Sequence, residues 1–392
     1  MSDKQKLKGR ILTPLRVIEN GEVCFENGKI TYVGPARTDD GSHVVTDYGD
    51  KYISPGFIDI HVHGGGGHDF MDCTLEAFLG AARLHAAHGT ATLLPTTLTC
   101  PDEELFMLFD LFAQAKAAEN DGAFLAGLHL EGPYFAPSQK GAQDERYIVP
   151  PRREHYEKIL EKANGSILRW SVAPELEGAM ELGRRLMREG ILPSIGHSDA
   201  VYETALEAFE NGYTHLTHFY SGMSGLVRKN SYRFPGLIES GYMEDGFTVE
   251  VIADGCHLPI SMLKYVYTAK GPSKTVLVTD AIRGAGQTEG HTIIGSLKNG
   301  YEVFIEDGVA KLLDRSAFAG SVATADRLVR NMYKHVCPIC DAVRMMTLTP
   351  ARIVGLKTKG VLAEGFDADF TVFDDDIRVE ATYSNGRKIY TK

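Results

Sequence analysis

The stretch of sequence that decides the fold is Phe57-Ile58-Asp59-Ile60-His61-Val62-His63, followed by Gly64-Gly65-Gly66-Gly67. Side chains alternate between the two faces of a strand, so Asp59, His61 and His63 share one face and three aliphatic residues share the other. An aliphatic face of this kind suits burial under helices. Imidazole is the commonest metal ligand among side chains, and the glycines allow a close approach to the backbone. The stretch therefore predicts a buried strand that carries half of a metal site.

The composition is that of an acidic globular protein. The 392 residues are 43% hydrophobic and 24% charged, and the formal net charge is −11. This balance gives no support for binding to nucleic acid or to an anionic membrane, so an anionic ligand would need a local basic patch. No stretch is apolar enough to cross a membrane, and the first residues lack the apolar core of a signal peptide. The six cysteines are scattered and do not make a disulfide framework. The expected location is the cytoplasm.

Strands and helices alternate through the middle of the chain. Apolar strands are predicted at residues 57–63, 90–96, 124–130, 168–173, 191–196, 213–218, 248–253 and 274–279. Helical patterns separate them, for example at 75–88, 103–118, 179–189 and 201–211. Such alternation predicts an α/β protein with a (β/α)8 TIM-type barrel, which we place at residues 55–359. A doubly wound sheet is disfavoured, because no glycine-rich phosphate loop leads from the first strand into a helix.

Short strands and turns occupy both ends of the chain. Asn20-Gly21 and Asn27-Gly28 are turn signals between apolar runs near the N-terminus, and Asn385-Gly386 is another near the C-terminus. Such runs predict small antiparallel sheets. Because the two β segments flank one long α/β stretch, residues 1–54 and 360–392 are predicted to form a small discontinuous β-sandwich domain.

An isolated His-x-His pair usually has no ligand function, so the metal prediction depends on the ends of the other strands. In a barrel of this type the active site lies at the C-terminal ends of the strands. The residues there that can bind a metal or move a proton are His61, His63, Glu131, His197, His218 and Asp280, with His257 after the seventh strand. Glu131 and Asp280 each follow an apolar run, and a buried carboxylate needs a metal or another partner. The set predicts a hydrolytic metal site.

Other histidines and cysteines are assigned different roles. Either His215 or His218 could be the metal ligand from the sixth strand, and we favour His218 because it lies nearer the mouth of the barrel. His129 shares the face of Glu131 one layer deeper, which favours a structural role or a place beneath the ligands. Cys337 and Cys340 form a single Cys-x-x-Cys pair, which cannot close a zinc site alone, and we interpret them as packing residues.

The candidate residues lie in the motifs D-x-H-x-H-G-G, H-L-E-G-P, G-H-S, T-H, D-G-x-H and V-T-D-A, in that order. The set resembles the amidohydrolase superfamily and, more narrowly, the N-acetylglucosamine-6-phosphate deacetylase family. The resemblance covers nearly the whole chain. H-L-E-G-P is its most specific part, because many relatives in the superfamily have a bridging lysine near the fourth strand instead. After His218 the chain departs from the pattern, with Ser221-Gly222 where the family usually has Asn-Ala.

The resemblance implies two metal sites that Glu131 can bridge. The ligands would be Glu131, His197 and His218 for the main metal, and His61 and His63 for a second one. Asp280 would act as general base and then as general acid. One or two divalent ions per subunit are implied; zinc is favoured, and iron, cobalt or manganese also suits histidine and carboxylate ligands.

The resemblance also implies a set of substrate-binding residues, which comprises His257, Gln143, Ala142, Ser221, Gly222, Arg233 and Arg228. His257 would contact the sugar or orient the substrate. Gln143 stands where some members have a histidine that polarises the amide carbonyl. Arg233 matches an arginine that contacts the sugar phosphate from the neighbouring subunit of a homodimer, and Arg228 adds positive charge nearby.

The implied activity is metal-dependent hydrolysis of the acetamide of N-acetylglucosamine 6-phosphate, which gives glucosamine 6-phosphate and acetate. The alternatives on the same scaffold are a deacetylase of the galacto epimer and an amidohydrolase that acts on a cyclic amide. A non-catalytic relative is disfavoured, because all the ligands and Asp280 are present together. The expected partner is a small amino-sugar phosphate, with neither nucleic acid nor membrane as a partner.

Overall fold

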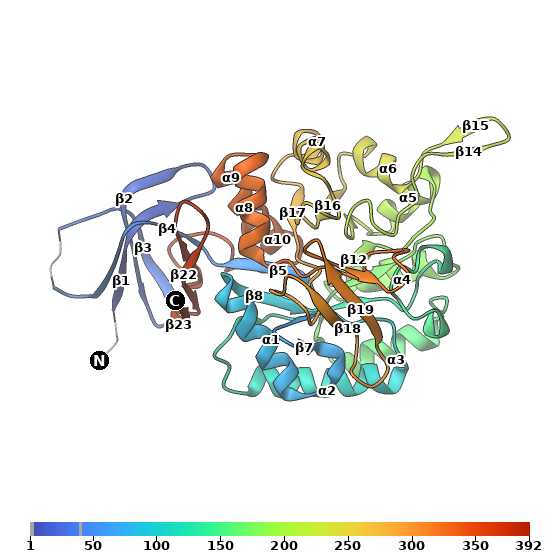
Figure 1. The fold of residues 1–392 in the computed structure, drawn as a ribbon, viewed down its shortest axis with the longest axis horizontal. Coiled ribbons are helices and arrows are strands. Elements are labelled where there is room, and N and C mark those ends of the chain that lie inside the picture. The colour runs from blue at the N-terminus through green and yellow to red at the C-terminus, as the bar shows by residue number, and fades with distance from the viewer. Residues whose placement is uncertain (1–3, 39–40) are drawn as a thin grey trace.

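The computed structural model describes residues 4–38 and 41–392. It consists of an α/β body and, at one end, a β-sheet (Figure 1). The first and last strands of the chain, blue and red in Figure 1, lie together in this sheet. No helix within the described ranges is long and apolar enough to span a bilayer.

The body is built around a ring of parallel strands. They are β5 (Phe57–Val62), β8 (Thr90–Pro95), β9 (Phe124–Leu125), β10 (Leu128–Glu131), β11 (Ile167–Val172), β12 (Leu192–Ile195), β13 (His215–Leu216), β16 (Thr248–Val251) and β17 (Thr275–Leu277). They pair in two sheets, ordered β5-β8-β9 and β10-β11-β12-β13-β16-β17. Parallel bridges from Thr96 to His129 and from Val62 to Ala281 join the two sheets at both edges. The predicted TIM-type barrel is confirmed, with the third predicted strand present as β9 and β10.

The strand β5 is buried as its sequence predicts, but its alternation is interrupted, because its register with β8 shifts between Asp59 and Val62. All six of its residues are buried. Ile58 and Ile60 pack in a hydrophobic cluster with Leu94 of β8, Val276 of β17 and Ala351 of α10. Asp59 accepts a hydrogen bond from Thr279 Oγ1, and His61 Nδ1 bonds to Glu250 Oε1 inside the barrel. Strands that are buried on both faces are typical of parallel barrels, because helices cover the outside.

Helices surround the barrel (Figure 1). They are α1 (Leu75–Ala87), α2 (Asp102–Ala117), α3 (Arg153–Ala163), α4 (Ala179–Arg188), α5 (Tyr202–Glu210), α6 (Leu237–Met243), α7 (Ile260–Lys270), α8 (Ala325–His335), α9 (Ile339–Met345) and α10 (Leu348–Ile353). The four helices that the sequence analysis names are all present, as α1, α2, α4 and α5. Cys340 lies within α9, and both it and Cys337 pack against the hydrophobic core of the body.

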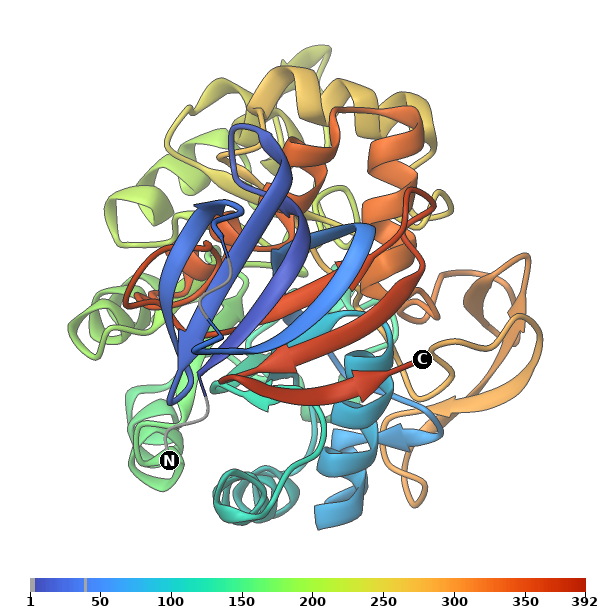
Figure 2. The ribbon, with the colours of Figure 1, turned by 90° about the vertical axis from the view of Figure 1, so that its left-hand side faces the viewer.

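The terminal strands form one seven-stranded sheet, which faces the viewer in Figure 2. They are β1 (Gln5–Leu12), β2 (Val17–Glu26), β3 (Lys29–Pro35), β4 (Val44–Pro55), β21 (Phe370–Phe373), β22 (Val379–Ser384) and β23 (Arg387–Thr391), in the order β23-β22-β21-β4-β1-β2-β3. The sandwich prediction is not confirmed, because these strands join in a single sheet. The sheet is mixed, since β1 pairs with β4 in parallel. It packs on the barrel partly through the rings of Phe57 and Phe373, whose centroids are 6.0 Å apart.

One of the three predicted Asn-Gly turns is wrong. Asn20 and Gly21 lie inside β2, which continues through them. A β-carbon at Gly21 would come within 2.4 Å of Ile11 Cγ1, so the glycine permits close packing against β1. The other two signals are turns, with left-handed φ angles of 52° at Asn27 and 49° at Asn385.

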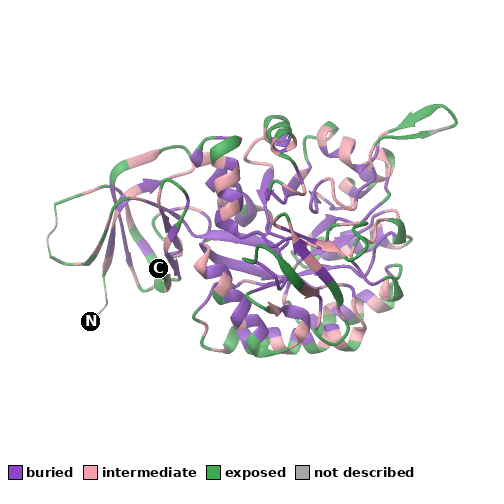
Figure 3. Ribbon diagram, in the orientation of Figure 1, coloured by how far each residue is buried: buried purple, intermediate pink, exposed green. Residues whose placement is uncertain are grey.

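Two inserted elements were not predicted. An antiparallel sheet of β18 (Gly290–Ile294), β19 (Tyr301–Glu306) and β20 (Val309–Leu312) stands between β17 and α8. A hairpin of β14 (Val227–Lys229) and β15 (Tyr232–Phe234) precedes α6 and projects from the body (Figure 1). Figure 3 shows it as almost wholly exposed, which explains the lack of an alternating apolar pattern in its sequence.

Candidate metal centre

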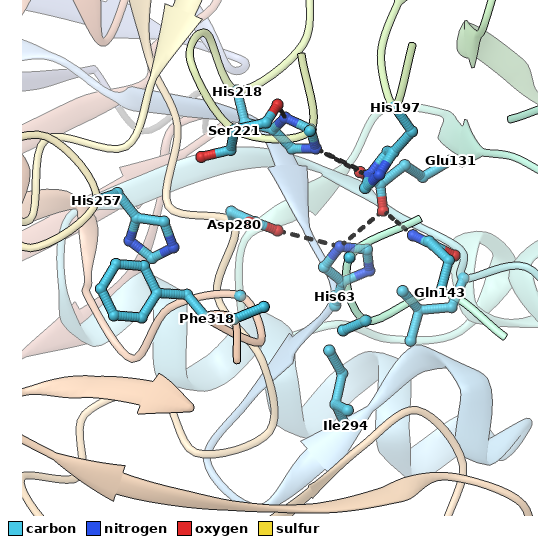
Figure 4. Close-up of a pocket in the computed structure, with 16 residues that line it drawn as sticks. His63, Glu131, Gln143, His197, His218, Ser221, His257, Asp280, Ile294 and Phe318 are labelled. Atoms are coloured by element: carbon cyan, nitrogen blue, oxygen red, sulfur yellow. Dashed lines mark hydrogen bonds and ion pairs between the residues drawn. The ribbon is translucent and has the colours of Figure 1, made fainter. Parts of the chain in front are cut away.

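A cavity lies at the C-terminal ends of the barrel strands (Figure 4). His63 lies just after β5, Glu131 ends β10 and Asp280 follows β17, and all three line the cavity. Ile294 of β18 and Phe318, which lies after β20, line it as well. The inserted antiparallel sheet therefore forms part of the cavity wall.

Glu131, His197 and His218 form a first cluster of buried ligand atoms. Glu131 Oε1 lies 3.2 Å from His197 Nε2 and 3.0 Å from His218 Nε2. The two Nε2 atoms are 3.1 Å apart. The structure thus brings together three residues from three different strand ends, and His218 rather than His215 belongs to this cluster.

His61, His63 and Asp280 form a second cluster. Asp280 Oδ1 lies 3.3 Å from His61 Nε2 and 3.1 Å from His63 Nε2. Glu131 stands between the two clusters, because its Oε1 is 3.4 Å from His61 Nε2 and its Oε2 is 3.4 Å from His63 Nε2. This is the position that a bridging carboxylate would occupy.

Hydrogen bonds on the far side of three rings determine which nitrogen faces the clusters. The pairs are His197 Nδ1 with Gln139 O at 2.7 Å, His218 Nδ1 with Ser221 O at 3.1 Å, and His61 Nδ1 with Glu250 Oε1 at 2.7 Å. These oxygens only accept, so each Nδ1 carries a proton, and Nε2 is the atom that each ring can offer to a metal in its neutral form. Converging lone pairs and carboxylate oxygens repel one another unless protons or a metal cation lie among them. Histidine and carboxylate donors suit a divalent transition metal, so the residues fit a metal site.

The buried carboxylates also raise the proton affinity of the imidazoles. Burial lowers the pKa of His61, but Asp280, Glu250 and Glu131 outweigh it and raise the pKa to about 10. The pKa of His63 rises to about 9, because its hydrogen bonds to Asp280 and Glu131 outweigh its burial. Burial raises the pKa of Asp280, yet the two imidazoles outweigh it and the pKa is lowered. Protons and a divalent cation therefore compete for the same nitrogen atoms.

Three residues of the clusters have a left-handed backbone. The φ angles are 50° at His197, 29° at His218 and 48° at Asp280. Such a conformation costs a residue with a β-carbon on the order of 1–3 kcal/mol and is concentrated at functional sites. Gly222 is also left-handed, and a β-carbon there would lie 3.1 Å from His197 Nδ1. Glycine at this position allows the loop to lie against the ring.

The predicted substrate-binding residues fall into two groups. His257, Gln143, Ala142, Ser221 and Gly222 line the cavity. His257 Nδ1 donates to Asp254 Oδ2 at 2.8 Å, which leaves its Nε2 for a ligand. Gln143 Nε2 donates to Glu131 Oε2 at 2.6 Å, and its Oε1 accepts from the backbone N–H of Thr99 at 2.8 Å.

The second group consists of Arg228 and Arg233, which lie outside the cavity. They are paired across the β14–β15 hairpin and are exposed. Within the described part of the chain, the cavity lining contains neither lysine nor arginine. These two arginines therefore do not reach the cavity of their own chain.

Sequence reasoning missed the charged pair that lies beneath the clusters. Arg169 Nη1 and Glu250 Oε2 are 2.5 Å apart, and both side chains are fully buried. The available signal was a charged residue in the middle of each of two apolar strands, because a buried charge needs a partner. His129 lies in the same layer, with its ring centroid 4.5 Å from that of His61.

Comparison with known proteins agrees with this geometry. The profile described as "Amidohydrolase family" matches residues 52–389. The chain belongs to the amidohydrolase family. A curated relative of this amidohydrolase is the N-acetylglucosamine-6-phosphate deacetylase of Bacillus subtilis (strain 168), which is 34% identical over 96% of this chain and 94% of the relative. Another is the N-acetylgalactosamine-6-phosphate deacetylase of Escherichia coli O157:H7, which is 31% identical over 96% of this chain and 97% of the relative.

A solved structure resembles this amidohydrolase over its whole length. It is a mutant N-acetyl-D-glucosamine-6-phosphate deacetylase from Mycobacterium smegmatis in complex with N-acetyl-D-glucosamine-6-phosphate. The TM-score is 0.90 at 28% identity, and the match covers 99% of this chain and 100% of that chain. The resemblance to the N-acetylglucosamine-6-phosphate deacetylases that the motifs indicate is confirmed.

The raised pKa values generate a prediction about metal affinity. A divalent metal must displace the protons held by His61 and His63, so its apparent affinity should rise with pH and should go on rising to about pH 10. Competition with a chelator at several pH values measures this. An affinity that stays constant above pH 7 would contradict it, and replacing the exposed His291 by alanine should leave the profile unchanged.

Proposed function

We propose that this amidohydrolase removes the acetyl group of N-acetylglucosamine 6-phosphate and releases glucosamine 6-phosphate and acetate. The observation that carries the proposal is the cavity at which two clusters of metal-binding side chains meet, with Asp280 in one of them. The names of its curated relatives give the substrate class, a phosphorylated N-acetyl amino sugar.

The proposed ligands are those that the motifs indicate: Glu131, His197 and His218 for one ion, and His61 and His63 with the bridging Glu131 for a second. The donor set favours zinc, with iron, cobalt or manganese as alternatives. A divalent metal, when bound there, supplies a Lewis acid for the amide carbonyl and lowers the pKa of water.

The side chains of the cavity transfer the proton, contact the substrate and hold Glu131 in place. Asp280 is ionised because its pKa is lowered, so it accepts a proton from the attacking water and delivers it to the departing amine. His257 is held by Asp254 and presents Nε2 to a sugar hydroxyl or, when protonated, to the developing oxyanion. Gln143 keeps Glu131 in place, because it donates to Glu131 Oε2 while Thr99 holds its own oxygen.

The phosphate needs a cation from outside the cavity of a single chain, since none lines it in the described residues. We propose that the protein is a homodimer in which Arg233 of the projecting hairpin contacts the phosphate in the partner's cavity, with Arg228 beside it. A guanidinium binds phosphate through charge-assisted and often bidentate hydrogen bonds.

The galacto epimer is the second candidate substrate. A curated relative of nearly the same sequence identity is named N-acetylgalactosamine-6-phosphate deacetylase. In addition, Ser221-Gly222 departs from the family pattern at the cavity wall. Acetate release from the two 6-phosphate epimers, measured side by side with added zinc, tests the proposal. Faster release from the gluco epimer supports it, faster release from the galacto epimer replaces it with the second candidate, and release from neither overturns both.

Replacing Asp280 by asparagine removes the proposed base without changing the size of the side chain. We expect kcat to fall by about 10²–10⁴-fold, the usual contribution of general acid–base catalysis. The variant should keep its fold and the metal held by Glu131, His197 and His218, which elemental analysis can check. An unchanged kcat would refute this role for Asp280.

Replacing Arg233 by alanine should raise KM for the phosphorylated sugar by about 10–100-fold, because hydrogen bonds between charged groups contribute about 1.5–3 kcal/mol. KM for the unphosphorylated sugar should change little. The control is alanine at Arg387, an exposed arginine on the terminal sheet. An equal rise in KM for both sugars would show that Arg233 does not recognise the phosphate.

A further inference from the structure

A buried ion pair lies directly beneath the candidate metal centre. Glu250 of β16 and Arg169 of β11 are both fully buried, and their closest atoms are 2.5 Å apart. Isolated buried charges are costly, and a buried pair gives little net stability compared with apolar residues of the same size. The contacts of this pair indicate a role other than stability.

Glu250 contacts one ligand of each cluster through the same oxygen atom. Its Oε1 accepts a hydrogen bond from His61 Nδ1 at 2.7 Å and another from the backbone N–H of His218 at 2.8 Å. The first bond places the proton of His61 on Nδ1 and so leaves Nε2 as the ligand atom. The second holds the backbone of His218, whose φ is 29°, at the end of its strand.

Arg169 holds Glu250 and also the residues that precede both ligands. Besides Glu250, it donates to Ile60 O at 3.2 Å and to Thr217 Oγ1 at 2.9 Å. Ile60 is adjacent to His61 in the sequence, and Thr217 is adjacent to His218. The guanidinium thus ties together the two strand ends on which these ligands stand.

We propose that Glu250, paired with Arg169, is a positioning residue that orients one ligand of each metal cluster before the metal binds. It does not line the cavity, and it acts through His61 and His218. The inference rests on the proposed metal centre but not on the proposed substrate.

The chain contains a second buried ion pair, away from the clusters, that serves as a matched control. Lys359 Nζ and Asp369 Oδ2 are 2.6 Å apart, and both side chains are nearly buried, at 5% and 6% exposed. Asp369 also accepts from the backbone N–H of Asn385, at the edge of the terminal sheet. Neither residue contacts a ligand of the clusters.

The test compares Glu250→Gln with Asp369→Asn in zinc affinity, measured by chelator competition on the purified metal-depleted chain. Glutamine keeps the size of Glu250 but removes its charge. We expect zinc affinity to fall about 10–100-fold, the usual effect of losing a partner of a metal ligand. In the cobalt-loaded Glu250→Gln variant the visible absorption bands should shift, because His61 and His218 are displaced. Asp369→Asn should change neither the affinity nor the spectrum.

The outcomes are distinguishable. Wild-type zinc affinity and cobalt spectrum in a folded Glu250→Gln variant would overturn the proposal, as would an equal loss of affinity in Asp369→Asn. If Glu250→Gln does not fold, Glu250→Asp keeps the charge beside Arg169 but draws the carboxylate away from His61, and the same loss of affinity is expected. Absence of tight zinc binding by the wild-type chain would instead count against the metal centre itself.

Discussion

The concentration of negative charge and lone pairs around Glu131 is the constraint on which the rest of the site depends. The Glu131 side chain is 3% exposed, and its oxygens lie 3.0–3.4 Å from Nε2 atoms of His61, His63, His197 and His218. Such a set is stable only if positive charge lies within it and if the imidazoles cannot turn away. The closed ring of strands meets the second condition, because each ligand stands at the end of a strand that its neighbours hold on both sides.

The barrel interior beneath the cavity is polar, whereas most barrels of this type fill their interior with aliphatic side chains. Arg169 and Glu250 form the charged part of this layer, and His129 bridges Thr96 and Ser171 through its two ring nitrogens. A buried polar network of this kind rigidifies a structure when its members are satisfied. Here it supports ligands that must keep their positions despite strained backbone angles.

Much of the site followed from the sequence because its residues obey local rules. Alternation in 57–63 puts His61 and His63 on one face, and the barrel rule brings Glu131, His197, His218 and Asp280 to the same end. Local rules failed where one residue type serves two purposes. Gly21 follows an asparagine as in a turn, but it is there to let β2 pack against Ile11. The inserted sheet of residues 290–312 was missed because no motif marked it.

The sequence by itself determined which side chains can bind a metal and on which strands they stand, since both depend on residue type and on neighbours a few positions away. The tertiary structure alone decided which nitrogen of each ring faces the cluster, because the partner of His61 Nδ1 is Glu250, 189 positions away along the chain. It also decided that Phe318 reaches the cavity and that Arg228 and Arg233 do not. Such contacts arise only when distant segments pack together, and no local pattern encodes them.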